Sequence, residues 1–533
     1  MQLLRWHRLL VSSQDSFSAK MIQFWNRWIL WPALLIVAGL PRLVGAFFLP
    51  NAFGDAYVYI RDIGTFSTKI STGSLRLTDL FGFWLPLYQF LSAIVNVLIK
   101  NGFYSGKIVS AVFGAGTCLF VYAITFRLTA DRRAALVMFL LIALNPLQVF
   151  YSASAMTDVP HAFFVVAALY FVLSRNWIVA AIFGALAGLT RVESWMLVAL
   201  IPFLQLTRER RISLVAILIL ILPPLFWFYI SWKATGDALA CFKQRQDYHD
   251  WLLMMNPSIA RFSLKQITSD TATLLVSTDI AVLVACCVAV WLVIRSLSNS
   301  VIGERGAFAS LRLRVKDAAT QVGQFESIIP PLLFFFAFLA LLIGAYVTHQ
   351  QPIIFPRYGL ILFTLGLPIL AWTYLWIRRN KPQIARRVFI GIVVICVLDA
   401  SVELVGAAGE INRYRAQRAG ADYLRDHFDR NSNAKIFCDE ATVRVLSGIP
   451  EERFLSSADA PRDREAFLKF LSDRHVVYLI VVETERSTPF GLFRDSGYNE
   501  PIGNYESAMH AHAEFLWTDI HVYRRIPRAA SGQ

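Results

Sequence analysis

The chain has 533 residues, of which 56% are hydrophobic and 17% are charged, and its formal net charge is +14. This composition, with 41 Phe and 14 Trp, is typical of a protein that crosses a membrane many times. The positive charge does not indicate nucleic-acid binding, because the basic residues gather in short segments between apolar runs, as the cytoplasmic loops of membrane proteins do.

Apolar runs of about the 20 residues needed to cross a bilayer recur over the first 405 residues. The preceding N-terminal segment is basic and polar, so the first run is expected to serve as an uncleaved anchor. The sequence predicts eleven crossings, near residues 28–49, 107–126, 134–151, 159–174, 177–190, 194–206, 212–232, 277–294, 328–348, 357–377 and 388–405.

A further apolar segment, WLPLYQFLSAIVNVLI at residues 84–99, is ambiguous. If it does not cross and the N-terminus is cytoplasmic, four basic loops lie inside, at residues 127–133, 207–211, 295–316 and 378–387. If it crosses, all four loops lie outside, against the positive-inside rule. We therefore expect residues 84–99 to form an interfacial helix at the outer surface, and the C-terminus to lie outside.

The C-terminal tail differs from the rest of the chain. Stretches such as REAFLKFLSDRHVVYLIVV alternate helical periodicity with β-rich runs, which is typical of a soluble α/β domain. The predicted fold class is an α-helical polytopic membrane protein with a C-terminal soluble α/β domain. The membrane domain would cover residues 1–405, with a long first extracytoplasmic loop at residues 50–106, and the extracytoplasmic domain would cover residues 406–533.

Ionisable residues at membrane depth are costly and by default mark function, and here they gather at the predicted outer ends of the spans. Asp55 follows the first span in NAFGDAYVYIRD, where it could instead be a loop acid or a helix N-cap. Asp158 and His161 lie in YSASAMTDVPHAFF, a pattern that also fits an N-cap with a first-turn proline. This pair could hold a polar ligand or a metal, although one Asp with one His is a weak metal signal.

Arginines lie on the same side. Arg191 and Glu193 share the short turn GLTRVESW, where a local ion pair without a further role is the alternative. Arg357 and Tyr358 open a late span, and such a pair can also be an interfacial anchor. Arg42, inside the first span, must reach outward or meet an anion. Arginines that bind phosphate and an Asp that acts as general base suit a reaction of an anionic, lipid-borne substrate.

The order and common sidedness of these motifs resemble the GT-C-type membrane glycosyltransferases. The shared features are an arginine near the end of the first span, an acid soon after it, a PLY-type interfacial helix, a second acid in an FYSxxxMxD context, GLTRxES, and RY opening a late span. The nearest branches are the protein O-mannosyltransferases and the bacterial enzymes that transfer aminoarabinose or other sugars from polyprenyl phosphate. The resemblance covers residues 25–405.

The resemblance implies that Asp55 is the catalytic base, that Asp158 assists acceptor or metal binding, and that Arg357 contacts the donor phosphate. By extension, the other candidates are the phosphate-binding residues Tyr358, Arg191 and Arg42 and the acceptor- or metal-assisting residues His161 and Glu193.

The first loop departs from the family pattern. Many members carry two adjacent acids there, whereas Asp55 is followed by Ala56, and the next acid is Asp62. Oligosaccharyltransferase activity is therefore disfavoured. No cofactor is required with certainty, and the question of a divalent metal stays open.

The resemblance implies transfer of a sugar from a polyprenyl-phosphate donor to a hydroxyl of a lipid, glycan or protein acceptor, with inversion. It also implies contact with membrane lipids and no nucleic-acid partner. The chain has neither a Rossmann glycine fingerprint nor a P-loop. It has no N-x-[ST] sequon, which favours a bacterial inner membrane.

Two alternatives remain at this point. A lipid or sugar transporter or flippase would place ionisable residues near the bilayer midplane on broken helices, often in paired repeats. An inactive relative of the transferases would serve assembly through its tail.

Overall fold

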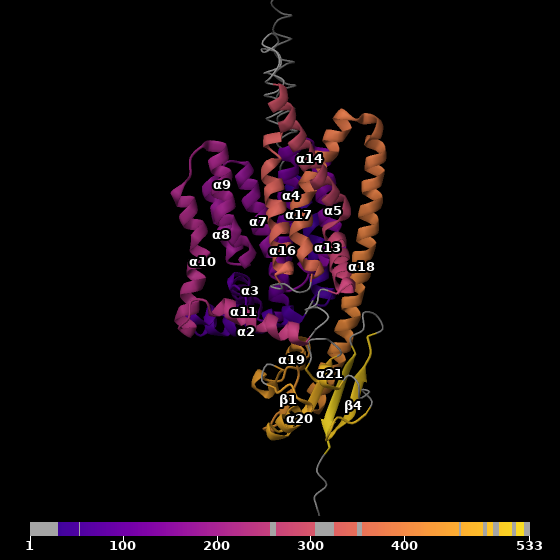
Figure 1. Ribbon diagram of the computed structural model, residues 1–533. Coiled ribbons are helices and arrows are strands. Elements are labelled where there is room, and N and C mark those ends of the chain that lie inside the picture. The colour runs from indigo at the N-terminus through magenta and orange to yellow at the C-terminus, as the bar shows by residue number, and fades with distance from the viewer. Residues whose placement is uncertain are drawn as a thin grey trace, which may run out of the picture.

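The computed structural model describes residues 30–52, 54–255, 263–303, 325–348, 354–457, 460–482, 488–493, 500–513 and 519–526. A bundle of helices carries a small sheet domain at one end (Figure 1). This arrangement confirms the predicted fold class. The predictions made for the N-terminal residues 1–29, and for most of the basic loop 295–316, fall outside the described residues.

Each of the eleven predicted apolar runs contains a helix. The bundle comprises the helix Leu30–Phe48 and then α4 (Gly102–Thr129), α5 (Arg132–Leu144), α6 (Pro146–Ser152), α7 (Asp158–Leu173), α8 (Trp177–Gly188), α9 (Leu197–Glu209), α10 (Leu214–Thr235), α13 (Leu264–Thr278), α14 (Ile280–Gly303), α16 (Ile329–Val347), α17 (Gly359–Asn380) and α18 (Pro382–His427).

Six helices among the described residues are long and apolar enough to cross a membrane. Two bent pairs, α5 with α6 and α13 with α14, raise this number to eight if each pair is one span. The shorter apolar helices are α7, α8 and α3 (Leu87–Ile99). By length and composition alone, the structure therefore gives six to eight spans, and the count of eleven stays a prediction.

Side-chain caps begin several of these helices. Asn101 accepts hydrogen bonds from two backbone N–H groups at the start of α4, and Asp131 does the same for α5. These bonds satisfy N–H groups that have no partner within the helix. Because only two residues separate α4 from α5, the two helices pack as antiparallel neighbours.

Two further helices lie across the lower end of the bundle in Figure 1, α2 (Gly54–Ser71) and α11 (Ala240–Met255), and α3 lies just above them. The segment predicted to be an interfacial helix is thus α3, which packs against α2 and α4. Single turns of 3-10 helix complete this end of the bundle, namely η1 (Leu77–Leu80), η2 (Val192–Met196) and η3 (Pro356–Tyr358).

The C-terminal domain is built on a five-stranded sheet with the order β2-β1-β3-β5-β4. Strands β1, β2 and β3 run parallel, whereas β5 is antiparallel to both β3 and β4. The central strand β3 reads VVYLIVV and is almost wholly buried, as expected for a strand covered on both faces. The elements are β1 (Lys435–Phe437), α19 (Ala441–Ser447), η4 (Glu451–Arg453), β2 (Phe454–Leu455), α20 (Arg464–Asp473), β3 (Val476–Val482), α21 (Thr488–Phe493), β4 (Tyr505–Ala511) and β5 (Ile520–Arg525).

Helix α18 connects the two parts without a break, and the proposed domain boundary at residue 405 falls inside it. The sheet domain also touches the bundle through α19, which packs on α2. Arg61 of α2 donates a hydrogen bond of 3.1 Å to Glu451. The C-terminal domain therefore lies against the helix that carries Asp55.

Candidate functional site

Asp55 lies in the first turn of α2. It pairs with an arginine that is 302 residues away in the sequence. Arg357 Nη1 donates a hydrogen bond of 2.8 Å to Asp55 Oδ2, and the Arg357 side chain is only 12% exposed. Since η3 begins with a proline that fixes the backbone just before α17, Arg357 enters the bundle where α2 crosses its end. The carboxylate is therefore more than a loop acid.

Asp158 is the first residue of α7, and the N-cap is Thr157, which makes no capping hydrogen bond. The alternative interpretation of Asp158 as an N-cap is therefore wrong. Its carboxylate instead accepts a hydrogen bond of 2.6 Å from Arg191 Nη1. Oxygen Oδ2 of Asp158 is buried and has no hydrogen-bond partner among the described residues, so it is a free acceptor within the site.

Arg191 also binds Glu193, with Nη2 at 2.8 Å from Oε1. Burial alone would raise the pKa of Glu193, but the charge of Arg191 and its hydrogen bond outweigh burial, and the pKa lies below its ordinary value. Glu193 is thus held as a carboxylate, and Arg191 is shared between two acids.

The ring of Tyr358 joins the two arginines. The guanidinium carbon of Arg357 lies 5.4 Å from the ring centroid, and that of Arg191 lies 5.6 Å from it, both within range of a cation–π contact. Asp55, Arg357, Arg191 and Asp158 therefore form one cluster, built from α2, η3, α7 and the turn before η2.

His161 lies one turn further along α7 and faces the same region. Its Nε2 is 2.7 Å from Ser194 Oγ, and its ring packs edge-on against Phe338 at 5.7 Å. The structure thus brings His161 to the cluster, where its ring nitrogen is hydrogen-bonded to a hydroxyl group.

The cluster opens into a cavity of about 250 Å³ between α7, α11, α16 and α17. Its lining combines charged with apolar side chains, as a phosphate on a hydrocarbon chain would need. The lining residues are Asp158, His161, Arg191, Val192, Glu193, Phe242, Arg245, His249, Phe338, Leu341, Leu342, Ala345, Arg357, Tyr358, Ile361 and Leu362.

Arg42 does not join this cluster. It is fully buried in the bundle, where it donates hydrogen bonds to Ser152 Oγ and to the carbonyl oxygens of Ala38, Ala143 and Ile142 at 2.8–3.2 Å. These bonds account for an arginine at membrane depth without a phosphate. The structure therefore separates Arg42 from the other candidate donor-binding residues.

Three residues of the site escaped the sequence analysis. Arg245 and His249 line the cavity from α11, and their spacing of four residues on a polar helix could have placed them on one face. Tyr59 lies one turn after Asp55 on α2. Burial, and next the charge of Asp55, raise the pKa of Tyr59 above its ordinary value, so its hydroxyl keeps its proton.

Metal-ligating side chains gather elsewhere in the molecule. Among the described residues, the group of three that could hold an ion is His510, His512 and Asp519 in the C-terminal domain. Among the described residues, Asp158 and His161 do not belong to such a group of three, so whether they bind a metal stays an open question.

A search of solved structures finds ArnT from Cupriavidus metallidurans bound to undecaprenyl phosphate, with a TM-score of 0.50 and 12% identity over 95% of this chain and 100% of that chain. The chain has a GT-C-type fold. The apo state of the same ArnT matches with a TM-score of 0.47 and 12% identity, over 93% of this chain and 98% of that chain.

The family model for dolichyl-phosphate-mannose-protein mannosyltransferases matches residues 77–204. Within the GT-C-type fold, this range runs from η1 to α9 and contains Asp158, His161, Arg191 and Glu193, but not Asp55 or Arg357. No curated protein sequence matches the chain. Together, the structural match and the family match agree with the GT-C-type resemblance of the sequence.

Proposed function

We propose that this protein is an integral-membrane glycosyltransferase that moves a sugar from a polyprenyl-phosphate donor to an acceptor hydroxyl on the extracytoplasmic face. The observation that carries the proposal is the ion pair between Asp55 and Arg357, because Arg357 also lines a cavity that has both charged and apolar walls. In this proposal, the general base Asp55 and the phosphate-binding Arg357 are in contact, beside apolar cavity residues that suit a lipid tail.

Arg357 and Arg191 are the donor-binding residues in this proposal. Both are arginines with low exposure, at 12% and 17%, and a planar guanidinium can engage two phosphate oxygens at once. Tyr358, which contacts both, would hold them in a common orientation. The apolar cavity residues on α16 and α17 would contact the first isoprene units of the donor.

Donor binding would also release the base. Without a donor, Arg357 is held by Asp55. An incoming phosphate competes for the guanidinium, and each hydrogen bond transferred to it leaves the Asp55 carboxylate freer to accept a proton. The arginine would thus couple the arrival of the donor to the readiness of Asp55.

The reaction would be a single displacement with inversion. Asp55 takes the proton of the acceptor hydroxyl. At the same time, the acceptor oxygen attacks the anomeric carbon of the donor sugar from the side opposite the phosphate. The bond between that carbon and the phosphate oxygen breaks, and polyprenyl phosphate leaves. The two arginines stabilise the negative charge that develops on its phosphate. Asp158, with its unpartnered buried Oδ2, would accept a hydrogen bond from the acceptor and so position it.

The comparisons support the substrate class. The solved ArnT that shares the fold is described as bound to undecaprenyl phosphate, and the matching family model is named for dolichyl-phosphate-mannose. Both names describe a polyprenyl phosphate. Neither defines the acceptor of this chain or distinguishes a hexose from a pentose.

The test is a transfer assay in nanodiscs with a polyprenyl-phosphate sugar or a nucleotide sugar as donor. We expect turnover with the polyprenyl-phosphate sugar and none with the nucleotide sugar. Asp55→Asn should lower turnover by about 10²–10⁴-fold, the range typical of a general base. Arg357→Lys should weaken donor use although it keeps the charge, because a single ammonium cannot replace the planar fork.

Asp62→Asn is the matched control, because Asp62 lies on the same helix and pairs with Arg61 instead of an arginine of the cavity. Its turnover should stay near that of the unmodified protein. If Asp55→Asn behaves like Asp62→Asn in a correctly folded sample, Asp55 is not the base. Turnover from a nucleotide sugar without lipid would place the donor site elsewhere.

A further inference from the structure

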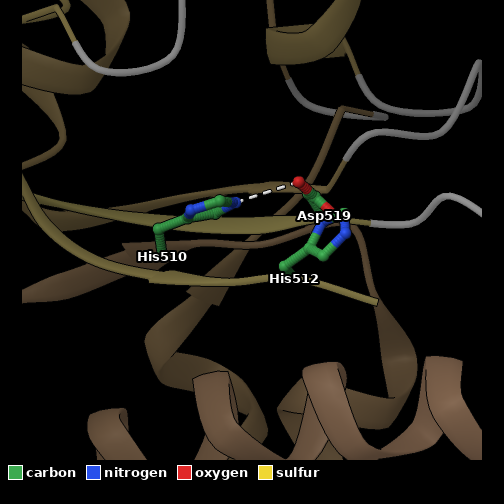
Figure 2. Close-up of side chains that lie close together, drawn as sticks. All are labelled: His510, His512 and Asp519. Atoms are coloured by element: carbon green, nitrogen blue, oxygen red, sulfur yellow. Dashed lines mark hydrogen bonds and ion pairs between the residues drawn. The ribbon is translucent and has the colours of Figure 1, made fainter. Parts of the chain in front are cut away.

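Two histidines and an aspartate meet at the open edge of the C-terminal sheet, away from the cavity. His510 belongs to the edge strand β4, His512 follows that strand, and Asp519 directly precedes β5. Figure 2 shows the three side chains turned toward one another. Because residues two apart on a strand point to the same side, the His-x-His pattern presents both imidazoles to the carboxylate.

The three side chains already share one point in space. His510 Nε2 lies 3.0 Å from Asp519 Oδ2, and His512 Nδ1 lies 2.6 Å from Asp519 Oδ1. Each histidine thus uses its own carboxylate oxygen, and one ligand atom from each residue lies within 4.8 Å of the other two.

These distances are close to those that a metal ion requires. Zinc binds imidazole nitrogen and carboxylate oxygen at about 2.0–2.2 Å, so two tetrahedral ligands lie roughly 3.3 Å apart. The observed nitrogen–oxygen contacts, 3.0 and 2.6 Å, are shorter than this by about 0.3 and 0.7 Å. Small rotations of the exposed histidines would open the space.

The ligands are also held in place. The backbone N–H of Ala513 donates to Asp519 Oδ1 at 3.2 Å, which orients the carboxylate. The His510 ring stacks in parallel on His521, with centroids 4.4 Å apart, and these two residues are paired across β4 and β5. Neighbouring groups that orient the ligands in this way are a regular feature of metal sites.

We propose that His510, His512 and Asp519 bind a divalent transition-metal ion of the zinc type, which links the edge strand β4 to β5. Two imidazoles and one carboxylate favour zinc and its neighbours over magnesium or calcium, which prefer sets of oxygen ligands. The ion would replace the protons that now lie between the imidazoles and the carboxylate. Because both histidines are exposed, water or a ligand from another molecule could occupy the remaining coordination positions of the ion.

The test uses the full-length protein in detergent, purified without a polyhistidine tag, with Zn²⁺, Co²⁺ and Mg²⁺ as probes. We expect one Zn²⁺ per chain after dialysis, and visible absorption bands when Co²⁺ is bound. Zn²⁺ in excess should raise the unfolding temperature of the C-terminal domain by several degrees, because it binds only the folded hairpin. Mg²⁺ should have no such effect.

His512→Gln and Asp519→Asn should each remove the bound zinc and the cobalt bands. His512 is 62% exposed, so its replacement should leave the fold intact. His427→Gln, at an exposed histidine of α18 in the same domain, is the matched control and should bind zinc normally. Zinc binding that survives both site variants, or binding weaker than millimolar, would overturn the proposal and leave a hydrogen-bonded cluster only.

Discussion

At the scale of single residues, the two candidate acids keep arginine partners in different surroundings. The Asp55 side chain is 29% exposed, whereas that of Asp158 is 6% exposed. Water can screen the first pair, but the second pair depends on its own hydrogen bonds for the solvation that burial removes. The Asp55 pair is therefore the more easily exchanged of the two, and Asp158 is the acid held more firmly by its partner.

The Arg191 cluster gives a prediction about stability. Arg191→Met should destabilise the membrane domain by about 3–5 kcal/mol, because it leaves the buried Asp158 carboxylate without its cation. Asp158→Asn should cost less, because Arg191 keeps its contact with Glu193. Thermal unfolding in detergent, followed by intrinsic fluorescence, measures both changes.

The double variant Asp158→Asn/Arg191→Met serves as the control. If the pair interacts as the structure indicates, the double variant should be more stable than the sum of the single changes predicts. Additive effects would mean that the two side chains do not depend on each other in solution.

Much of the charged cluster follows from local sequence signals. Acids and arginines stand beside apolar runs in the sequence, so their common position at one end of the bundle could be predicted from span counting. The pairing of each acid with its arginine could not be predicted from the sequence. Asp55 and Arg357 are 302 residues apart, and nothing near either residue indicates the other.

At the scale of elements, the bend between α5 and α6 explains Arg42. The two helices meet at 58°, and α5 ends there with carbonyl groups that have no partner within the helix. Arg42 donates hydrogen bonds to two of them, those of Ile142 and Ala143. The negative end of the helix dipole also stabilises a cation at this position. Gly114 of α4 leaves room for this contact, since a side chain there would meet Ser152 and Arg42.

Arg42→Met should therefore lower stability without changing donor affinity. The loss of hydrogen bonds to buried carbonyl groups should cost at least about 1–3 kcal/mol. A thermal unfolding curve measures this effect, and the donor KM in the transfer assay tests the affinity. A raised KM with an unchanged unfolding temperature would return Arg42 to the donor site.

At the scale of the whole molecule, the connections divide between two ends. Figure 1 shows the α9–α10 and α17–α18 connections at the upper end, opposite the C-terminal domain. These connections carry the basic segments 207–211 and 378–387. The helices α2 and α11 and the charged cluster lie at the other end. This division agrees with the predicted positive-inside arrangement, in which the cluster would lie outside the cytoplasm.

Single cysteines can test this orientation. With Cys287 and Cys396 replaced, Asn433→Cys should react with an impermeant thiol reagent in intact cells, whereas Asn380→Cys should react only after the membrane is opened. Both positions are exposed, so access and not burial decides the result. The reverse pattern of labelling would invert the topology and remove the basis for an extracytoplasmic active site.

The sequence by itself determined that the chain is a helical membrane protein, where its apolar helices lie, and the class of the C-terminal domain. These properties depend on residues that are neighbours in the chain, since the free energy of crossing a bilayer accumulates over about 20 contiguous residues. The tertiary structure decided the partners. It paired Asp55 with Arg357, placed Arg42 at the end of α5, and brought His510, His512 and Asp519 together. Such contacts depend on how helices and strands pack, and packing joins residues that no local pattern connects.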